Sequence, residues 1–360
     1  MDAAGKRRRP LSECSRREIA EIGLGAAAIA VTAALVYGDA PAVLRFGVAA
    51  LTLAILARLV GLGVEQLGGR LGAAGAGVVQ SALGNLPELF IALFALHKGL
   101  IEVVQAALVG SILANSMLVL GIAFIAGGLK HGTQKFPSPY ARILATLTLL
   151  AAAILSVPSL AHAFHTPAAA HGKTLSLICA GVLLAIFALT LRGLLADLPG
   201  EPAHEPPRWF LGTTLGLLVG AALGAAIVSD WFVSALQPAL GSLHMSQEFA
   251  GLVIVAIAGN AVENVVGIQL ARKNRPDFAI AVIINSSLQI ALALTPVLVF
   301  ASLFFATSLT LVFPTFLAIS LLFAAGLGAL VVYDGESTWS EGVILVGLYV
   351  VLAASFWWGT

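Results

Sequence analysis

Long apolar stretches, separated by short clusters of Pro, Gly and charged residues, run through almost the whole chain. A helix needs about 20 mostly apolar residues to cross a bilayer, and dividing the sequence at these clusters yields about eleven such segments. The pattern therefore predicts an all-α integral membrane protein. The predicted helices cover residues 19–38, 41–63, 72–96, 100–127, 138–158, 172–195, 209–229, 246–271, 276–302, 307–333 and 341–358.

The composition supports a membrane protein and excludes several other classes. Hydrophobic residues make up 59% of the 360 residues, charged residues 10%, and the mean hydropathy is +0.99; such a chain belongs in a lipid bilayer. A net charge of +1 provides no basic field, so nucleic acid is not an expected partner. The two cysteines, Cys14 and Cys179, form neither a disulfide framework nor a metal motif. No nucleotide-binding loop is present, and we expect a transporter without cofactors rather than an enzyme.

Basic residues fall mainly on one side of the predicted topology. If the N-terminus is cytoplasmic, sixteen Lys and Arg residues lie on or near that side, and only Arg45, Lys98 and Lys173 lie opposite. This matches the positive-inside rule. The first apolar segment is long enough to span, so we interpret it as a retained helix rather than a signal peptide. The absence of a signal or transit segment and the compact loops favour a prokaryotic inner membrane.

One short polar motif occurs twice inside apolar segments. GNLPE at Gly84 to Glu88 and GNAVE at Gly259 to Glu263 are 175 residues apart. At this offset the following residues also match, and the identical pairs are Gly84/Gly259, Asn85/Asn260, Glu88/Glu263, Lys98/Lys273, Ala106/Ala281, Ser111/Ser286 and Leu113/Leu288. The Asn, Glu and Ser pairs are not explained by apolar composition, so the chain contains an internal repeat.

The repeat predicts how the chain is organised. Residues 1–40 form a basic N-terminus and a first helix, and residues 41–200 and 201–360 each form a unit of five helices. An odd number of spans makes the second unit enter the membrane from the opposite side. Inverted repeats of this kind place substrate sites near the midplane, at the interface of the two units.

The motif residues are suited to a shared cation site. A carboxylate at the bilayer centre costs on the order of 2.5 to 3.5 kcal/mol, so Glu88 and Glu263 need a partner, a cavity or an ion. In a continuous helix Asn85 shares a face with Glu88, and Asn260 with Glu263. The glycines before these asparagines, Gly84 and Gly259, permit close approach of helices.

The following helices add hydroxyl groups at a matching place. Ser111 and Ser286 lie 23 residues after the two glutamates, on the return helices. Oxygen ligands of this kind suit a hard cation such as calcium. Two carboxylates in one apolar site cannot both stay ionised without a counter-ion. Either a cation or protons must occupy the pair, which predicts exchange if the site opens to one side at a time.

Segments 75–124 and 245–299, which contain these motifs, resemble the two alpha repeats of cation/proton exchangers in the calcium/cation antiporter superfamily. The resemblance implies that the cation and proton site is lined by Glu88, Glu263, Asn85, Asn260, Ser111 and Ser286, with Asn115 and Gln289 nearby. It also implies that the helices predicted at 41–63 and 209–229 move across a rigid core.

Three departures from the family pattern leave the ion open. Asn264 stands where proton exchangers commonly carry His, Asn285 stands where Gly is usual, and the connection from Asp197 to Arg208 has few acidic residues. Calcium is the first choice, and a monovalent or another divalent cation is not excluded. A sodium-coupled exchanger of the same fold is one alternative; a cation channel or a membrane scaffold is another. Gln80 and Gln289 are second-tier pore or packing residues, and the sequence leaves open whether the chain forms a homo-oligomer.

Overall fold

The computed structural model describes residues 14–136, 138–196 and 208–359; the side chains of 68–69, 71–82, 138–140, 191–196 and 262 are outside the description. The first half contains the helices α1 (Arg16–Tyr37), α2 (Ala42–Gly84), α3 (Leu86–His97), α4 (Ile101–Leu113), η1 (Ala114–Val119), α5 (Leu120–His131), α6 (Ser138–Ala163), η2 (Pro167–His171) and α7 (Gly172–Ala196). The second half contains α8 (Leu211–Leu243), α9 (Gln247–Phe249), η3 (Ala250–Val255), α10 (Ala256–Gly259), α11 (Ala261–Arg272), α12 (Pro276–Gln289), η4 (Ile290–Leu294), α13 (Thr295–Ala301), η5 (Ser302–Phe304), α14 (Thr315–Val332) and α15 (Trp339–Phe356). Two short strands, β1 (Gln134–Lys135) and β2 (Glu336–Ser337), pair antiparallel.

The predicted class, an all-α membrane protein, is confirmed. Within the described part of the chain, nine helices are long and apolar enough to cross a bilayer, and the bent pair Gln247–Gly259 and Glu263–Arg272 makes ten. The shorter apolar helix α3 follows α2 after one residue, Asn85. Counting the end of α2 together with α3 as a further broken span is compatible with eleven spans, a number that stays a prediction.

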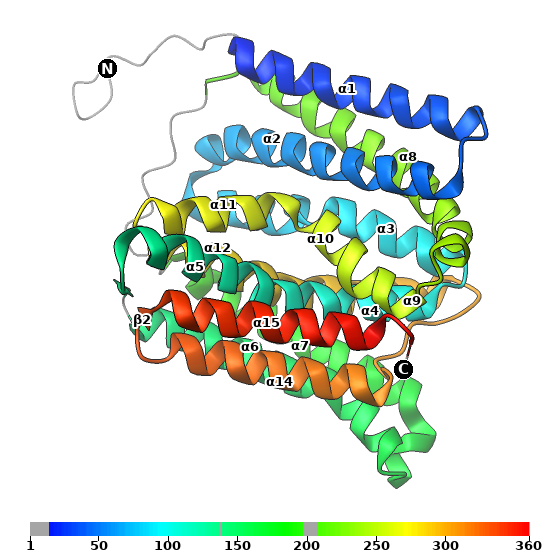
Figure 1. The fold of residues 1–360 in the computed structure, drawn as a ribbon, viewed down its shortest axis with the longest axis vertical. Helices are drawn as coiled ribbons and strands as arrows, with labels where there is room; N and C mark the ends of the chain where they lie inside the picture. Colours follow the sequence, from blue (N-terminus) through cyan, green and yellow to red (C-terminus); the bar gives the residue numbers. More distant parts are fainter. Residues whose placement is uncertain (1–13, 137, 197–207, 360) are drawn as a thin grey trace.

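The two halves repeat the same order of elements in opposite directions. The end of α2, α3, α4, η1 and α5 correspond to η3–α10, α11, α12, η4 and α13. Figure 1 shows α3 and α11 leading from the middle of the bundle toward opposite ends. The inverted arrangement predicted from the odd number of spans is therefore present.

A layer of three long helices covers one side of the bundle, formed by α1, α2 and α8 (Figure 1). The α2 and α8 helices pack closely, because a Cβ atom on Gly63 would lie 2.6 Å from the side chain of Leu218. The rings of Phe46 and Phe232 stack between the same two helices, with centroids 4.7 Å apart. This layer rests on the helices that carry the repeated motif, since α2 contacts α3, α10 and α11 and α8 contacts α3.

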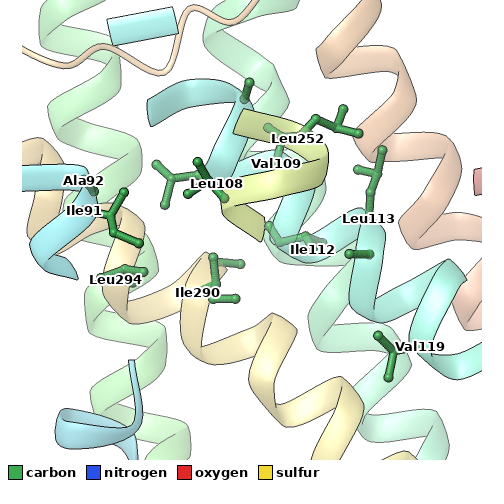
Figure 2. Packing of buried hydrophobic residues seen from close by; sticks show 14 of the residues in the cluster. Ile91, Ala92, Leu108, Val109, Ile112, Leu113, Val119, Leu252, Ile290 and Leu294 are labelled. Carbon is green, nitrogen blue, oxygen red and sulfur yellow. The ribbon is translucent and has the colours of Figure 1, made fainter. Parts of the chain in front are cut away.

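Two glycines let the return helix α4 cross η3 with direct backbone contact. A Cβ atom on Gly110 would lie 2.4 Å from both Cα and the carbonyl oxygen of Leu252, and one on Gly251 would lie 2.5 Å from the carbonyl oxygen of Val103. Leu252 lies among the apolar side chains of α4 and η4 in Figure 2. Side chains of any size at the two glycines would separate the helices, so this crossing sets the distance between the repeats.

The helix predicted at 307–333 is wrong at its start. Residues 305–314 are not helical, and α14 begins only at Thr315, directly after Pro314. Buried side chains replace the helical hydrogen bonds of this segment: Ser159 bonds the carbonyl of Leu311 and the amide of Phe313, and Gln105 donates to the carbonyls of Thr310 and Val312. Apolar residues here fill the protein core in an extended form, which hydropathy alone does not distinguish from a membrane helix.

Candidate functional site

Both copies of the repeated motif lie at a break in a helix. Asn85 separates α2 from α3 and has φ −93° and ψ 15°; Asn260 separates α10 from α11 and has φ −95° and ψ 18°. Glu88 and Glu263 lie in the first turns of the helices that follow, where the positive end of the helix dipole favours a negative charge. We expected each Asn and Glu to share a face of one continuous helix; that geometry is wrong, because the helix stops at the asparagine.

Glu88 is bonded by residues of both repeats. Its Oε1 atom accepts a hydrogen bond of 2.5 Å from Nδ2 of Asn260 and one of 3.2 Å from the hydroxyl of Ser111. Its Oε2 atom is buried and has no hydrogen-bond partner. A buried polar atom without a partner is costly, so this oxygen is a candidate contact for a cation or a proton.

Asn260 connects the other predicted residues. It is completely buried, and besides Glu88 its Nδ2 atom lies 3.0 Å from the hydroxyl of Ser111. Its Oδ1 atom accepts hydrogen bonds from Ser286 at 3.0 Å and from Nδ2 of Asn115 at 3.5 Å. Asn115 also donates to Ser286 at 3.1 Å. The structure thus brings one glutamate, one motif asparagine and both serines into a single network. Asn115 is part of this network, whereas the sequence placed it only near the site.

Gly259 provides the space that the carboxylate of Glu88 occupies. A Cβ atom on this glycine would lie 2.3 Å from Cγ and 2.8 Å from Oε1 of Glu88. Real Cβ atoms do not approach other atoms so closely. The glycine therefore allows the second broken helix to lie directly against the glutamate of the first repeat.

The remaining predicted residues lie outside this network. Nδ2 of Asn85 donates to Oε1 of Gln289 at 3.3 Å. Among the described hydrogen bonds, none joins Glu263 to the network, and its side chain is half-buried. Asn264 has a buried Oδ1 atom without a hydrogen-bond partner. Gly84 ends α2, and the side chain of Gln80 lies outside the described residues, as do the basic residues before Cys14.

Short π-helical segments follow the return helices of both repeats, a feature that sequence reasoning did not anticipate. The η1 segment (Ala114–Val119) follows α4 and η4 (Ile290–Leu294) follows α12, so the two lie at nearly the same place in the repeat. Such π-bulges are frequent at functional sites. Asn115 lies in the first of them, whereas the matching residue of the second, Ile290, is apolar and buried.

The network is enclosed by apolar side chains. Figure 2 shows Ile91 and Ala92 of α3 near Leu108 of α4 and Leu294 of η4. These residues, with Glu88 and Ser111, line a cavity of about 20 Å³, which is large enough for about one water molecule. In such surroundings a charge is poorly solvated, so the polar atoms of the site have to balance it themselves.

The donor set contains carboxylate, amide and hydroxyl oxygens, which are ligands of hard cations. Within the described residues there is no cluster of three or more His, Cys, Asp and Glu side chains that could hold a metal ion. The oxygens of this network that could contact a cation are Oε2 of Glu88 and Oδ1 of Asn115, because both are buried and lack a hydrogen-bond donor.

Comparisons with known proteins agree with this architecture. The sequence model of the family described as sodium/calcium exchanger protein matches residues 41–195 and 213–358. The Ca(2+)/H(+) antiporter ChaA of Bacillus subtilis (strain 168) is 34% identical over 326 residues, which are 88% of this chain and 92% of that protein. Among solved structures, native YfkE superposes with a TM-score of 0.81 at 30% identity, covering 94% of this chain and 99% of that one. The H+/Ca2+ exchanger CAX superposes with a TM-score of 0.75 at 17% identity, covering 95% of this chain and 92% of that one, which supports the fold alone.

Proposed function

Because the chain belongs to the sodium/calcium exchanger protein family, with cation/proton exchangers among its relatives, we propose that it is a secondary antiporter that exchanges calcium for protons. The observation that carries the proposal is the bonding of Glu88 from one inverted repeat to Asn260 of the other. A site built from both repeats can change its accessible side when the repeats shift relative to each other.

Glu88 and Glu263 are the exchange pair in this proposal. When both are ionised, a divalent cation balances their charge and contacts Oε2 of Glu88 and Oδ1 of Asn115, two buried oxygens that lack hydrogen-bond partners. When protons bind the carboxylates, the charge that holds the cation is lost and the cation leaves. Ser111 and Asn260 hold the carboxylate of Glu88 by direct hydrogen bonds, and Ser286 in turn bonds Asn260. Asn85 and Gln289 form a second amide pair outside this network.

The excess of basic residues on one side supports a cytoplasmic N-terminus, and we place the protein in a prokaryotic inner membrane. The lipid bilayer, the cation and protons are its partners in this proposal, and no cofactor takes part.

The test is transport by the protein reconstituted in liposomes with an imposed pH gradient. Calcium uptake and internal pH are followed together for the parent, Glu88→Gln and Glu263→Gln, with Glu102→Gln as control because Glu102 is an exposed acid at the start of α4. We expect coupled calcium and proton fluxes in the parent and in Glu102→Gln, and no coupled flux in Glu88→Gln or Glu263→Gln. Calcium flux that ignores the pH gradient, or survives both substitutions, would reject the proposal; a requirement for sodium would identify a sodium-coupled exchanger, and uncoupled flux a channel.

A further inference from the structure

Trp209, which lies just before α8, is held by the first two helices through each of its polar groups. It is almost completely buried. Its indole N–H donates to Oε2 of Glu18 in α1 at 3.3 Å, and its backbone N–H lies 3.4 Å from Oε1 of Gln66 in α2. Its carbonyl oxygen accepts from the guanidinium of Arg70, also in α2. The start of the second half of the protein is therefore docked on α1 and α2.

The neighbouring Arg208 closes the same set of contacts. Its guanidinium forms an ion pair of 2.7 Å with Glu18, and its backbone N–H donates to Gln66 at 2.9 Å. The side chain of Glu18 is only 8% exposed, and a buried carboxylate of this kind is tolerated only when it is paired and hydrogen-bonded. We call Glu18, Gln66, Arg70, Arg208 and Trp209 the Trp209 clamp.

Further polar contacts hold α1 along its length. The hydroxyls of Thr32 in α1 and Thr52 in α2 are buried and 2.8 Å apart. Glu21 of α1 pairs with Arg58 of α2 at 3.5 Å. By contrast, the described residues contain one ion pair between this layer and the core. Lys98, which follows α3, pairs with Asp230 of α8 at 3.0 Å.

The layer covers the helices that carry the site, because α2 contacts both broken helices and α8 contacts α3. The resemblance to cation/proton exchangers implies that α2 and α8 shift across the core when access to the site changes sides, and the proposed exchange function depends on such a shift. If α1 were only a lipid-facing helix, it would need no buried carboxylate and no buried hydroxyl pair to attach it. These contacts are explained if they keep the three helices together during the shift.

We propose that α1 moves together with α2 and α8, and that Glu18 and Trp209 are positioning residues that fix α1 and the start of α8 to α2. The inference rests on the proposed exchange function for its transport readout. It adds that α1, which lies outside the two repeats, belongs to the moving part.

The first experiment uses two cysteine pairs, each in a chain with Cys14→Ser and Cys179→Ser. Thr32→Cys with Thr52→Cys joins α1 to α2, and Lys98→Cys with Asp230→Cys joins the core to α8. A disulfide in the first pair is expected to leave the exchange rate within about twofold of the reduced protein, and a short thiol-reactive cross-link in the second to stop exchange. Arrest by the first disulfide that a reductant reverses would overturn the proposal, as would normal exchange with the second pair cross-linked.

The second experiment loosens the clamp. Glu18→Ala is expected to lower kcat about tenfold while KM for calcium stays within about twofold, because the residue does not contact the ion. Ile19→Ala, next to Glu18 on α1 and 58% exposed, is the control and should behave as the parent. If Glu18→Ala does not fold, Trp209→Phe, which removes the indole N–H and part of the ring while keeping an aromatic side chain, should also lower kcat. An unchanged kcat in the folded clamp variants, or an increase in KM that accounts for the loss, contradicts the positioning role.

A readout that does not depend on transport separates this inference from the proposed function. Spin labels on α1 and α2, and on α3 and α8, report distances in calcium-saturated and in acidic calcium-free protein. A constant α1–α2 distance with a changing α3–α8 distance supports the three-helix body even if calcium is not the transported ion. A changing α1–α2 distance, or two constant distances, rejects it.

Discussion

Asn260 of the second repeat donates a hydrogen bond of 2.5 Å to Glu88 of the first, although 172 residues separate them in sequence. The second copy of the motif therefore supplies a hydrogen bond to the glutamate of the first, whereas Asn85 of the first copy donates to Gln289. This relationship makes the contribution of each residue measurable by substitution.

Asn260→Ala should reduce exchange without preventing folding. It removes a hydrogen bond to a charged group, which contributes about 1.5–3 kcal/mol, and the expected loss in kcat/KM is about 10- to 150-fold. The measurement is calcium-dependent proton flux in liposomes over a range of calcium concentrations. Gln269→Ala, an exposed position on α11, the helix that follows Asn260, is the control; equal effects of the two substitutions would contradict a specific role for Asn260.

Gly259→Ala should displace the carboxylate of Glu88, because the new methyl group would lie 2.3 Å from its Cγ atom. We expect KM for calcium to rise by about tenfold or more as the carboxylate leaves its hydrogen bonds. Gly216→Ala on α8, where no atom lies within 4 Å of the added group, should keep the parent KM. A parent-like KM for Gly259→Ala would show that Glu88 does not need its observed position.

Asn115→Leu should weaken calcium binding more than it weakens folding. It removes Oδ1, one of the buried oxygens without a donor, and keeps a side chain of similar size. Isothermal titration with calcium is expected to give a dissociation constant about tenfold higher. Ile290→Val, at the matching place in the second repeat, is the control, and a similar change in both variants would argue against a ligand role for Asn115.

Gly110→Ala should destabilise the fold itself. The added Cβ atom would lie 2.4 Å from backbone atoms of Leu252, and neither backbone can move away without separating α4 from η3. Overpacking of this kind costs about 1–3 kcal/mol or more, so the thermal unfolding midpoint in detergent should fall by several degrees. Gly220→Ala has free space and should leave the midpoint unchanged or raise it.

Ser159→Ala should loosen the extended segment 305–314. The hydroxyl bonds both the carbonyl of Leu311 and the amide of Phe313 in the interior, and leaving buried backbone groups unpaired costs about 1–3 kcal/mol each. A lower unfolding midpoint and faster proteolysis within 305–314 are expected. Ser242→Ala, exposed on α8, controls for the loss of a serine hydroxyl, and an unchanged midpoint for Ser159→Ala would contradict the role of these bonds.

The fold class was predictable because hydropathy determines which segments enter a bilayer, and the repeat was predictable because Asn, Glu and Ser are rare in such segments. Close proximity of Glu88, Asn260, Ser111 and Ser286 was also expected, because inverted repeats bring matching motifs together at their interface. The hydrogen-bond partner of each residue could not be predicted from the sequence. It depends on the breaks at Asn85 and Asn260 and on the direct crossing at Gly110, which are tertiary features.

The extended segment at 305–314 and the clamp at Trp209 were missed for a different reason. Leu309, Leu311 and Phe313 are as apolar as helix residues, and the groups that hold their backbone come from distant helices. Similarly, Trp209 pairs with residues 139 to 191 positions earlier. Local patterns do not contain such contacts, although Glu18, a carboxylate near the start of an apolar helix that also carries Glu21, was a signal that a partner was needed.

The clamp also has a consequence for biosynthesis. The ribosome makes α1 and α2 well before Trp209, so the acceptors that receive this residue, Glu18 and Gln66, are complete while the second repeat is still being translated. The first half thus already contains the residues on which the first helix of the second half docks. Assembly of the inverted repeats can begin with this single docking step, before any residue of the second half of the ion site has left the ribosome.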